Sequence, residues 1–231
     1  MTKVRWGTIA LALFTALAGS IAKAGEKPGA TANDRCRDRA ATAVQKRYEN
    51  VRDVSARFEQ TTHAARIGTS SGGAPATSRG RVTLAKPGKM RWSYEDPEPS
   101  LVVSDGKTVW IFDPAFGEVQ KLPAAEGFLT GAAAQFLLGA GDMRRDFKVA
   151  AVSCGDTTAE LELTPRQPAS YEKLSLEVDP STGDVHRTQI TDLLGNVVMV
   201  EFRDQQFNLK PAESEFRFEV PEGVRVIELS Q

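Results

Sequence analysis

Residues that could carry acid–base or nucleophilic chemistry are scarce in this chain. The two histidines, His63 and His186, both fall on polar positions of predicted strands. The sequence contains neither a G-x-S-x-G nucleophile elbow nor an H-E-x-x-H zinc motif. Among the many carboxylates, Asp105 and Asp113 belong to turns, and no glycine-rich loop precedes a helix to cradle phosphate. The sequence therefore predicts a protein that is not an enzyme and that uses no metal and no cofactor.

The chemistry that remains is the binding of apolar groups, and residues 86–114 are the candidate for it. Met90, Trp92 and Tyr94 alternate with polar residues, which is the period of a strand with one apolar face. After a turn bracketed by prolines, L-V-V leads into S-D-G-K, a hairpin signal because glycine accepts the positive φ of a tight turn. The return strand is T-V-W-I-F. Three short strands in succession are therefore predicted here.

The second and third of these strands are apolar on both faces. Val109 and Ile111 point one way while Trp110 and Phe112 point the other, whereas an antiparallel strand with one wet face should alternate. Exposed apolar surface costs about 25 cal/mol per Å², so each face needs a cover. Two interpretations stay open: the aromatic residues fill a closed core, or one face lines a cavity for an apolar ligand.

Two helices are predicted among the strands. The first is amphipathic and runs from Asp34, its capping residue, to about Asn50. The second covers about 126–138, is rich in alanine and strongly apolar, and is broken by a G-A-G sequence. A single further helical turn is predicted at 142–145.

Most of the remaining chain has the alternation of strands. A strand ends near His63, and a loop rich in glycine, serine and threonine follows at 66–78, which we expect to be a flexible hairpin connection. A late strand is predicted at 215–220, followed by a tail at 224–229. With ten or eleven strands in all, the predicted fold is α+β and mainly β, with one large antiparallel curled sheet under a helical lid.

A cavity on such a sheet would be capped by the apolar helix at 126–138. An acyl chain could displace this cap because one set of apolar contacts replaces another, so that loading and release would need no nucleotide. The residues predicted to line the cavity are Met90, Trp92, Tyr94, Leu101, Val103, Trp110, Phe112, Phe128, Phe136 and Leu137.

The N-terminus has the features of a cleavable secretory signal. Lys3 and Arg5 form a basic n-region, Ile9–Leu17 an apolar h-region, and A-K-A ending at Ala24 a cleavage site. The apolar run is too short for a membrane span of about 20 residues. We therefore expect residues 1–24 to be a signal peptide, cleaved after Ala24, and the mature protein to be soluble in the periplasm.

The length and charge of the mature chain fit one ordinary domain. About 200 residues remain after cleavage, which we divide into a flexible tail at 25–33 and a single domain at 34–231. The net charge falls from −1 to −4 because the leader contains three basic residues and no acidic one. Without a clustered basic face we expect no nucleic-acid partner, and we expect a monomer.

Cys36 and Cys154 are the only cysteines. In an oxidising compartment a disulfide is the favoured interpretation, and it would tie the first helix to the middle of the sheet. The alternative is a pair of buried, unpaired thiols.

The order of these motifs resembles a known family. A basic residue and a proline at Lys86–Pro87, an aromatic strand, and then L-V-V-S-D-G-K-T-V-W-I-F-D-P resemble the periplasmic lipoprotein carriers of the LolA family. The S-D-G-K-x-x-W-x-x-x-P core is the most specific part. The resemblance continues in an F-x-Q strand at Phe58, an F-L-L helix near Phe136 and a P-x-G-V segment from Pro221.

The resemblance implies an incomplete β-barrel with helices as a lid. It also implies a carrier that takes acylated lipoproteins from an inner-membrane ABC-type release complex and passes them to an outer-membrane lipoprotein receptor. Lys86 matches the family's basic residue, usually arginine, that latches the lid; the alternative is a solvated turn lysine. Met90 matches an apolar cavity position. The lack of a lipobox cysteine favours the carrier over the lipid-anchored receptor of the same fold.

Two other functions stay open. A periplasmic interaction module could sense lipoproteins or misfolded peptides on the same type of sheet, and an extended peptide bound at a sheet edge would identify it. An enzyme would have a cluster of titrating groups in the cavity.

Overall fold

The computed structural model describes residues 31–65, 74–124 and 141–229. The predicted signal peptide at 1–24 lies outside these ranges, as does most of the predicted tail at 25–33. The helix predicted at 126–138 also lies outside them, with its proposed cavity residues Phe128, Phe136 and Leu137.

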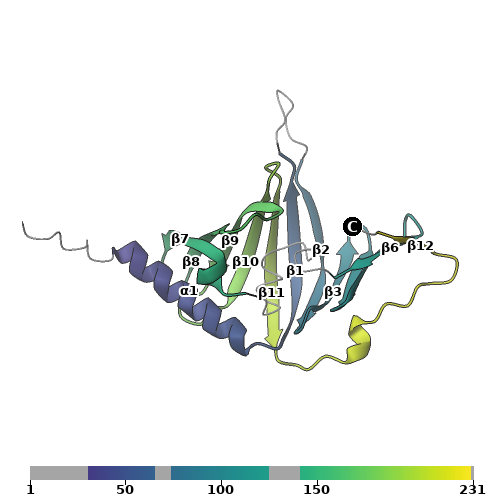
Figure 1. Ribbon diagram of the computed structural model, residues 1–231, viewed down its shortest axis with the longest axis horizontal. Coiled ribbons are helices and arrows are strands. Elements are labelled where there is room, and N and C mark those ends of the chain that lie inside the picture. The colour runs from purple at the N-terminus through teal and green to yellow at the C-terminus, as the bar shows by residue number, and fades with distance from the viewer. Residues whose placement is uncertain (1–30, 66–73, 125–140, 230–231) are drawn as a thin grey trace, which may run out of the picture.

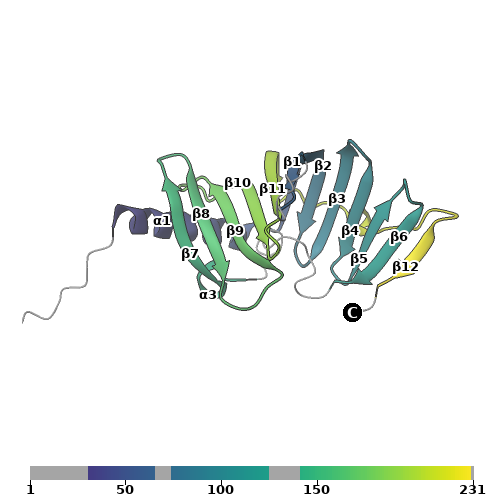
Figure 2. The ribbon, with the colours of Figure 1, turned by 90° about the horizontal axis from the view of Figure 1, so that it is seen from above.

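One open sheet of twelve strands makes up most of the described chain (Figure 1). The strands lie in the order β12-β6-β5-β4-β3-β2-β1-β11-β10-β9-β8-β7, so β12 and β7 form opposite edges (Figure 2). Neighbouring strands are antiparallel except for β12 and β6, which are parallel. The predicted mainly β fold with one curled sheet is confirmed. The strands are β1 (Asp53–His63), β2 (Ala76–Ala85), β3 (Lys89–Asp96), β4 (Ser100–Asp105), β5 (Thr108–Asp113), β6 (Glu118–Pro123), β7 (Phe147–Cys154), β8 (Ala159–Pro165), β9 (Tyr171–Val178), β10 (Val185–Asp192), β11 (Val197–Phe207) and β12 (Arg225–Glu228).

The strands predicted from alternating patterns are confirmed from β1 to β11. In β8, for example, Ala159, Leu161 and Leu163 are buried and glutamates stand between them. Successive side chains of a strand point to opposite faces, so this strand packs one face on the core and turns the other toward water. β2 is longer than predicted and begins at Ala76, inside the stretch predicted as loop.

Helix α1 (Ala32–Asn50) packs against β7 and β8. A capping box opens it: the hydroxyl of Thr31 accepts a hydrogen bond from the backbone N–H of Asp34, and the Asp34 carboxylate accepts one from the backbone N–H of Thr31. Asp34 is therefore not the cap, and α1 begins inside the predicted tail at 25–33. The end of the helix at Asn50 agrees with the prediction. The buried stripe of α1 consists of Ala40, Ala41, Val44 and Tyr48.

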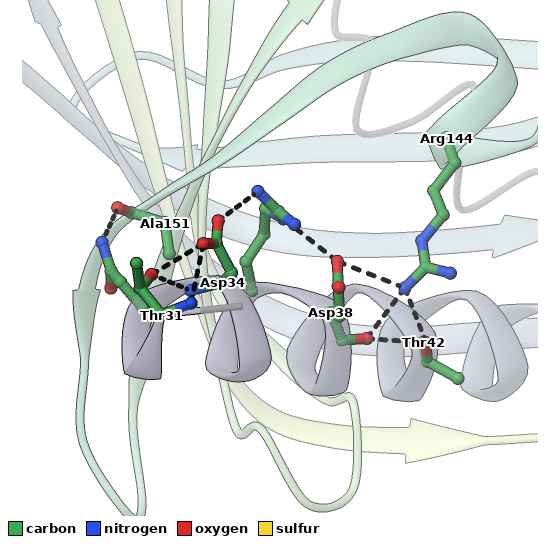
Figure 3. A network of polar contacts seen from close by, with 8 residues as sticks. Thr31, Asp34, Asp38, Thr42, Arg144 and Ala151 are labelled. Atoms are coloured by element: carbon green, nitrogen blue, oxygen red, sulfur yellow. Dashed lines mark hydrogen bonds and ion pairs between the residues drawn. The ribbon is translucent and has the colours of Figure 1, made fainter. Parts of the chain in front are cut away.

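The N-terminal end of α1 is fixed covalently to the edge of the sheet. Cys36 and Cys154, the last residue of β7, form a disulfide with their Cα atoms 6.3 Å apart, so the predicted pairing is confirmed. Next to it, the side-chain amide of Asn33 donates to the carbonyl oxygen of Ala151 in β7 at 3.1 Å (Figure 3). This end of the helix is therefore anchored by a hydrogen bond and by a covalent crosslink.

The short helix α3 (Met143–Asp146) supports the middle of α1. One guanidinium nitrogen of Arg144 donates to the carbonyl oxygen of Asp38 and to the hydroxyl of Thr42, both at 2.9 Å (Figure 3). Met143 is fully buried, and its backbone N–H donates to the side chain of Gln45 at 3.0 Å. The single helical turn predicted in this region is confirmed.

The chain after β11 does not form the strand predicted at 215–220. Glu213–Phe216 is instead a 3-10 helix, η1, that lies against β3 and β4, and Phe216 is 2% exposed. The alternation of Phe216 and Phe218 resembles a strand, but both rings pack onto a face of the sheet, and the backbone pairs with no neighbouring strand in the described ranges. The chain then returns to the edge of the sheet as β12.

Removing the disulfide should lower stability while leaving the fold intact. Its two cysteines are 118 residues apart, and closing so long a loop lowers the conformational entropy of the unfolded chain, which stabilises the fold by up to about 5 kcal/mol. We expect the Cys36→Ser/Cys154→Ser variant to lose about 3 kcal/mol in its free energy of unfolding in urea. The wild type in reductant should behave in the same way. Equal midpoints for the oxidised wild type and the variant would contradict this role.

Candidate apolar binding site

The register of β3, β4 and β5 sorts the predicted cavity residues onto two faces of the sheet. Trp92 lies opposite Val102, so the residues that flank Val102 in β4 point to the other face, as do their partners in β5. We call the side of Trp92, against which α1 packs, the inner face, and the opposite side the outer face. The prediction of one cavity lined by all these residues is therefore wrong. The predicted residues on the outer face are Leu101, Val103, Trp110 and Phe112.

Four aromatic side chains, Phe58, Trp92, Tyr94 and Phe202, meet on the inner face and form what we call the aromatic cluster. The ring centre of Phe58 lies 4.8 Å from that of Trp92 and 5.1 Å from that of Tyr94, both in edge-to-face contact. The ring of Trp92 also lies 6.4 Å from that of Phe202. Phe58 is buried, whereas the other three are half-buried. The inner face therefore presents an aromatic surface that is only partly covered.

Gly80 of β2 makes room for the aromatic cluster. It lies between Phe58 of β1 and Tyr94 of β3 in the register of the sheet. A Cβ atom at this position would lie 2.0 Å from the carbonyl oxygen of Ser93 and 3.0 Å from the ring of Phe58. Any larger residue would displace β3 or the Phe58 ring, so glycine permits their close approach.

Met90 and Tyr94 are both fixed on the inner face, by burial and by a hydrogen bond respectively. Met90 lies opposite Leu84 of β2 and is 5% exposed, so it belongs to the floor of the inner face. The hydroxyl of Tyr94 donates to the side-chain oxygen of Gln60 at 3.1 Å. Burial raises the pKa of Tyr94, which keeps the hydroxyl protonated and able to donate.

Phe58 and Phe202 were missed as site residues in the sequence. They lie opposite each other on β1 and β11, which are far apart in the chain. Alternation indicates that each belongs to a strand, but it does not say which strands pair. The F-x-Q motif at Phe58 was the only available signal.

The outer face is closed by the chain that follows β11. The ring of Phe218 lies 6.4 Å from that of Trp110 and 5.7 Å from that of Phe112. Beside them Val103 is fully buried, and the guanidinium of Arg91 donates to the carbonyl oxygen of Glu215 at 3.2 Å. The outer-face aromatic residues therefore hold the C-terminal segment in place.

The K-P-G-K and S-D-G-K stretches form two turns packed against each other. Gly88 and Gly106 both have positive φ, and a Cβ on Gly106 would lie 2.8 Å from the carbonyl oxygen of Pro87. The fully buried hydroxyl of Ser104 donates to the carbonyl oxygen of Gly88 at 3.0 Å and accepts from the N–H of Gly106 at 3.1 Å. These contacts fix the backbone next to Lys86.

The ammonium group of Lys86 donates a hydrogen bond to the carbonyl oxygen of Tyr48, in the last turn of α1. Carbonyl groups in the last turn lack a helical partner and form the negative end of the helix dipole, which attracts a cation. Burial lowers the pKa of Lys86, and the carboxylate of Glu49 acts in the opposite direction. The residue predicted as a latch thus contacts the C-terminal end of a helix.

Further contacts hold this end of α1, which Val51 and Arg52 connect directly to β1. The guanidinium of Arg47 pairs with the Asp184 carboxylate at 2.7 Å and lies 4.1 Å from the centre of the Phe207 ring. The hydroxyl of Tyr48 accepts a hydrogen bond from the N–H of Val185 at 3.3 Å, and burial raises the pKa of this tyrosine. The two ends of α1 therefore differ in how strongly they are attached.

The space beneath the C-terminal half of α1 is small and apolar. Its volume is about 10 Å³, which is room for roughly one water molecule. Phe202 belongs both to this pocket and to the aromatic cluster, so the two are continuous. The pocket is lined by Tyr48, Val54, Ala56, Val82, Leu84, Val185, Phe202 and Gln205.

In residues 31–65, 74–124 and 141–229, no group of three or more His, Cys, Asp or Glu side chains could hold a metal ion. None of the helices in these ranges is long and apolar enough to cross a bilayer.

Replacing Gly80 by alanine should loosen the aromatic cluster. The added methyl group would overlap the carbonyl oxygen of Ser93, so we expect the free energy of unfolding to fall by about 2 kcal/mol. Urea denaturation measures this. Gly155→Ala is the matched control, because its Cβ would lie 3.2 Å from the nearest atom, in an exposed turn. Equal stabilities for the two variants would contradict the close approach at Gly80.

Comparison with protein families matches residues 49–219 to the family described as outer membrane lipoprotein carrier protein LolA. An outer-membrane lipoprotein carrier protein of Cupriavidus necator is 30% identical over 174 residues, which are 75% of this chain and 81% of the relative. One of Nitrosospira multiformis is 31% identical over 182 residues, with 78% and 84% of the chains covered.

Solved structures resemble the chain at lower sequence identity. An uncharacterised conserved protein of Thermus thermophilus has a TM-score of 0.50 at 12% identity, covering 83% of this chain and 98% of that protein. A LolA superfamily protein of Nitrosomonas europaea has a TM-score of 0.44 at 14% identity, covering 79% and 97%. The first of these shares the fold. Because the family match spans most of the sheet and includes the paired turns and the aromatic cluster, the chain belongs to the LolA family of outer membrane lipoprotein carrier proteins.

Proposed function

We propose that this protein carries lipoproteins by holding their acyl chains against the aromatic cluster on the inner face. The observation that supports this is a partly covered aromatic surface, formed by Trp92, Tyr94 and Phe202 and continuous with an apolar pocket under α1. Aromatic and aliphatic side chains give an acyl chain apolar contacts without requiring polar partners. Membership of the LolA family supports the same assignment.

The proposed route follows the names of the relatives, which are outer-membrane lipoprotein carriers. The chain would be exported by residues 1–24, cleaved after Ala24, and act in the periplasm as a monomer. It would accept acylated lipoproteins from an inner-membrane ABC-type release complex and deliver them to an outer-membrane lipoprotein receptor. We assign it no catalytic residue.

The small volume under α1 requires a cover that moves. Ligand sites commonly enclose roughly 300–1,000 Å³, whereas the pocket under α1 has about 10 Å³. Breaking the contacts of Lys86 and Arg47 would let the C-terminal half of α1 shift relative to the sheet, with its connection to β1 as a hinge, while the disulfide at Cys36 holds the other end. We propose that Phe128, Phe136 and Leu137 cap the same face from the neighbouring segment.

Lys86 would act as the latch of the closed state. Its hydrogen bond to Tyr48 ties the last turn of α1 to the turn before Met90, so lifting the helix would break it. A lysine makes fewer and less planar hydrogen bonds than an arginine. The latch would therefore be weak, which suits a cover that must open without an energy source.

Trp92 and Trp110, the two tryptophans outside the predicted signal peptide, give a direct test because they lie on opposite faces of the sheet. An acyl chain carrying bromine atoms quenches tryptophan fluorescence only at short range. We expect a brominated triacylated lipopeptide to quench Trp110→Phe, which keeps Trp92, and to leave Trp92→Phe almost unquenched. Quenching of Trp92→Phe alone would place the acyl chains on the outer face, and no quenching of either variant would contradict acyl binding.

Loss of the latch should favour the open state. Lys86→Leu removes a hydrogen bond worth about 1 kcal/mol, so we expect about fivefold tighter binding of a soluble acylated peptide, with slower release to an acceptor. Fluorescence titration and release kinetics measure both. Lys86→Arg should restore wild-type values.

The matched control for the latch is Lys89→Leu. Lys89 pairs with Glu213 of η1, on the face of the sheet opposite to α1. The affinity of the Lys89→Leu variant for the soluble acylated peptide should equal that of the wild type. If Lys86→Leu and Lys89→Leu behave alike, Lys86 is not a latch.

A further inference from the structure

The turn between β10 and β11 exposes two adjacent leucines. Leu193 is 67% exposed and Leu194 is 78% exposed. The turn lies at the end of the sheet opposite the latch at Lys86, beside the end of β1 (Figure 1). Single exposed leucines are common on protein surfaces. Two in succession at the tip of a hairpin, where polar residues are usual, form a small exposed apolar patch.

This exposure is built into the turn. The carboxylate of Asp192 accepts hydrogen bonds from the N–H of Leu194 at 2.8 Å, and from the N–H and side-chain amide of Asn196 at 2.8 and 2.7 Å. These bonds hold the pKa of Asp192 below its usual range. The side-chain oxygen of Asn196 accepts from the N–H of Ala65, which ties the turn to the end of β1. These hydrogen bonds therefore fix the conformation of the turn that exposes the two leucines.

An apolar track connects this turn with the aromatic cluster. Val198, Val200 and Phe202 follow one another on the inner face of β11, and Ile190 of β10 lies opposite Val198. Val198 and Ile190 are half-buried and Val200 is 7% exposed. The track begins at the leucine turn and ends at Phe202, so the two apolar features lie at the two ends of the same stretch of strand.

We propose that Leu193 and Leu194 insert into the surface of a lipid bilayer, which places the β11 track where an acyl chain enters or leaves the membrane. This inference rests on the proposed carrier function and adds a membrane contact made by the chain itself. The composition of the tip favours lipid over protein as the partner. Protein interfaces depend on tryptophan, tyrosine and arginine, with leucine under-represented, and need far more area than two side chains offer. Aliphatic side chains suit the acyl boundary of a bilayer.

The test measures binding of the mature chain to vesicles of phosphatidylethanolamine and phosphatidylglycerol by co-sedimentation. We expect Leu193→Gln/Leu194→Gln to bind at least about tenfold less than the wild type. Leu209→Gln is the matched control: Leu209 is 56% exposed, beyond the opposite end of β11, and the variant should bind as the wild type does. Absence of wild-type binding, equal binding by the double variant, or an equal loss in Leu209→Gln would overturn the proposal.

Binding of a soluble brominated lipopeptide separates this inference from the carrier function. The double variant should bind the lipopeptide with the affinity of the wild type, because neither leucine belongs to the aromatic cluster. If the double variant loses lipopeptide binding as well as vesicle binding, the leucines do not act as a separate membrane contact. If the wild type binds vesicles but no lipopeptide, the carrier function fails while the membrane contact stands.

Discussion

The central constraint on this structure is that β4 and β5 are apolar on both faces, so the sheet needs two covers. Alternation along each strand sends Trp92 to one side and Trp110 to the other. On the outer side the C-terminal segment packs Phe218 against Trp110. On the inner side the aromatic rings remain half-buried next to the C-terminal end of α1. The outer cover is therefore part of the fold, and we propose that the inner cover is exchanged for a ligand.

Helix α1 combines strong and weak attachment in a single element. The disulfide at Cys36 and the bracing by Arg144 fix its N-terminal half, whereas Lys86, Arg47 and the two residues that lead into β1 hold its C-terminal half. We propose that the C-terminal half shifts when a ligand enters, with the connection to β1 as the hinge. The paired glycine turns serve this arrangement, because they position Lys86 beneath the last turn of the helix.

The sequence predicted the elements well and their assembly poorly. Period-2 alternation located the strands because one face of most of them is buried, and the oxidising compartment indicated the pairing of Cys36 with Cys154. Alternation could not show that β1 pairs with β11, so Phe58 and Phe202 were missed. It also could not show that the aromatic residues of β5, Trp110 and Phe112, face away from Trp92, because this depends on register across three strands. The strand predicted at 215–220 failed because rings packing onto a sheet face follow the same alternation.

Identification of what the protein holds in its own compartment tests the central claim most directly. The mature protein, purified without detergent from cells in which lipoprotein delivery is blocked, can be analysed by intact mass spectrometry for bound species. If the inner face exchanges its cover for acyl chains, the protein will carry bound acylated lipoproteins at a molar ratio close to one to one. An empty protein, or one that carries only unacylated peptides, would contradict the account.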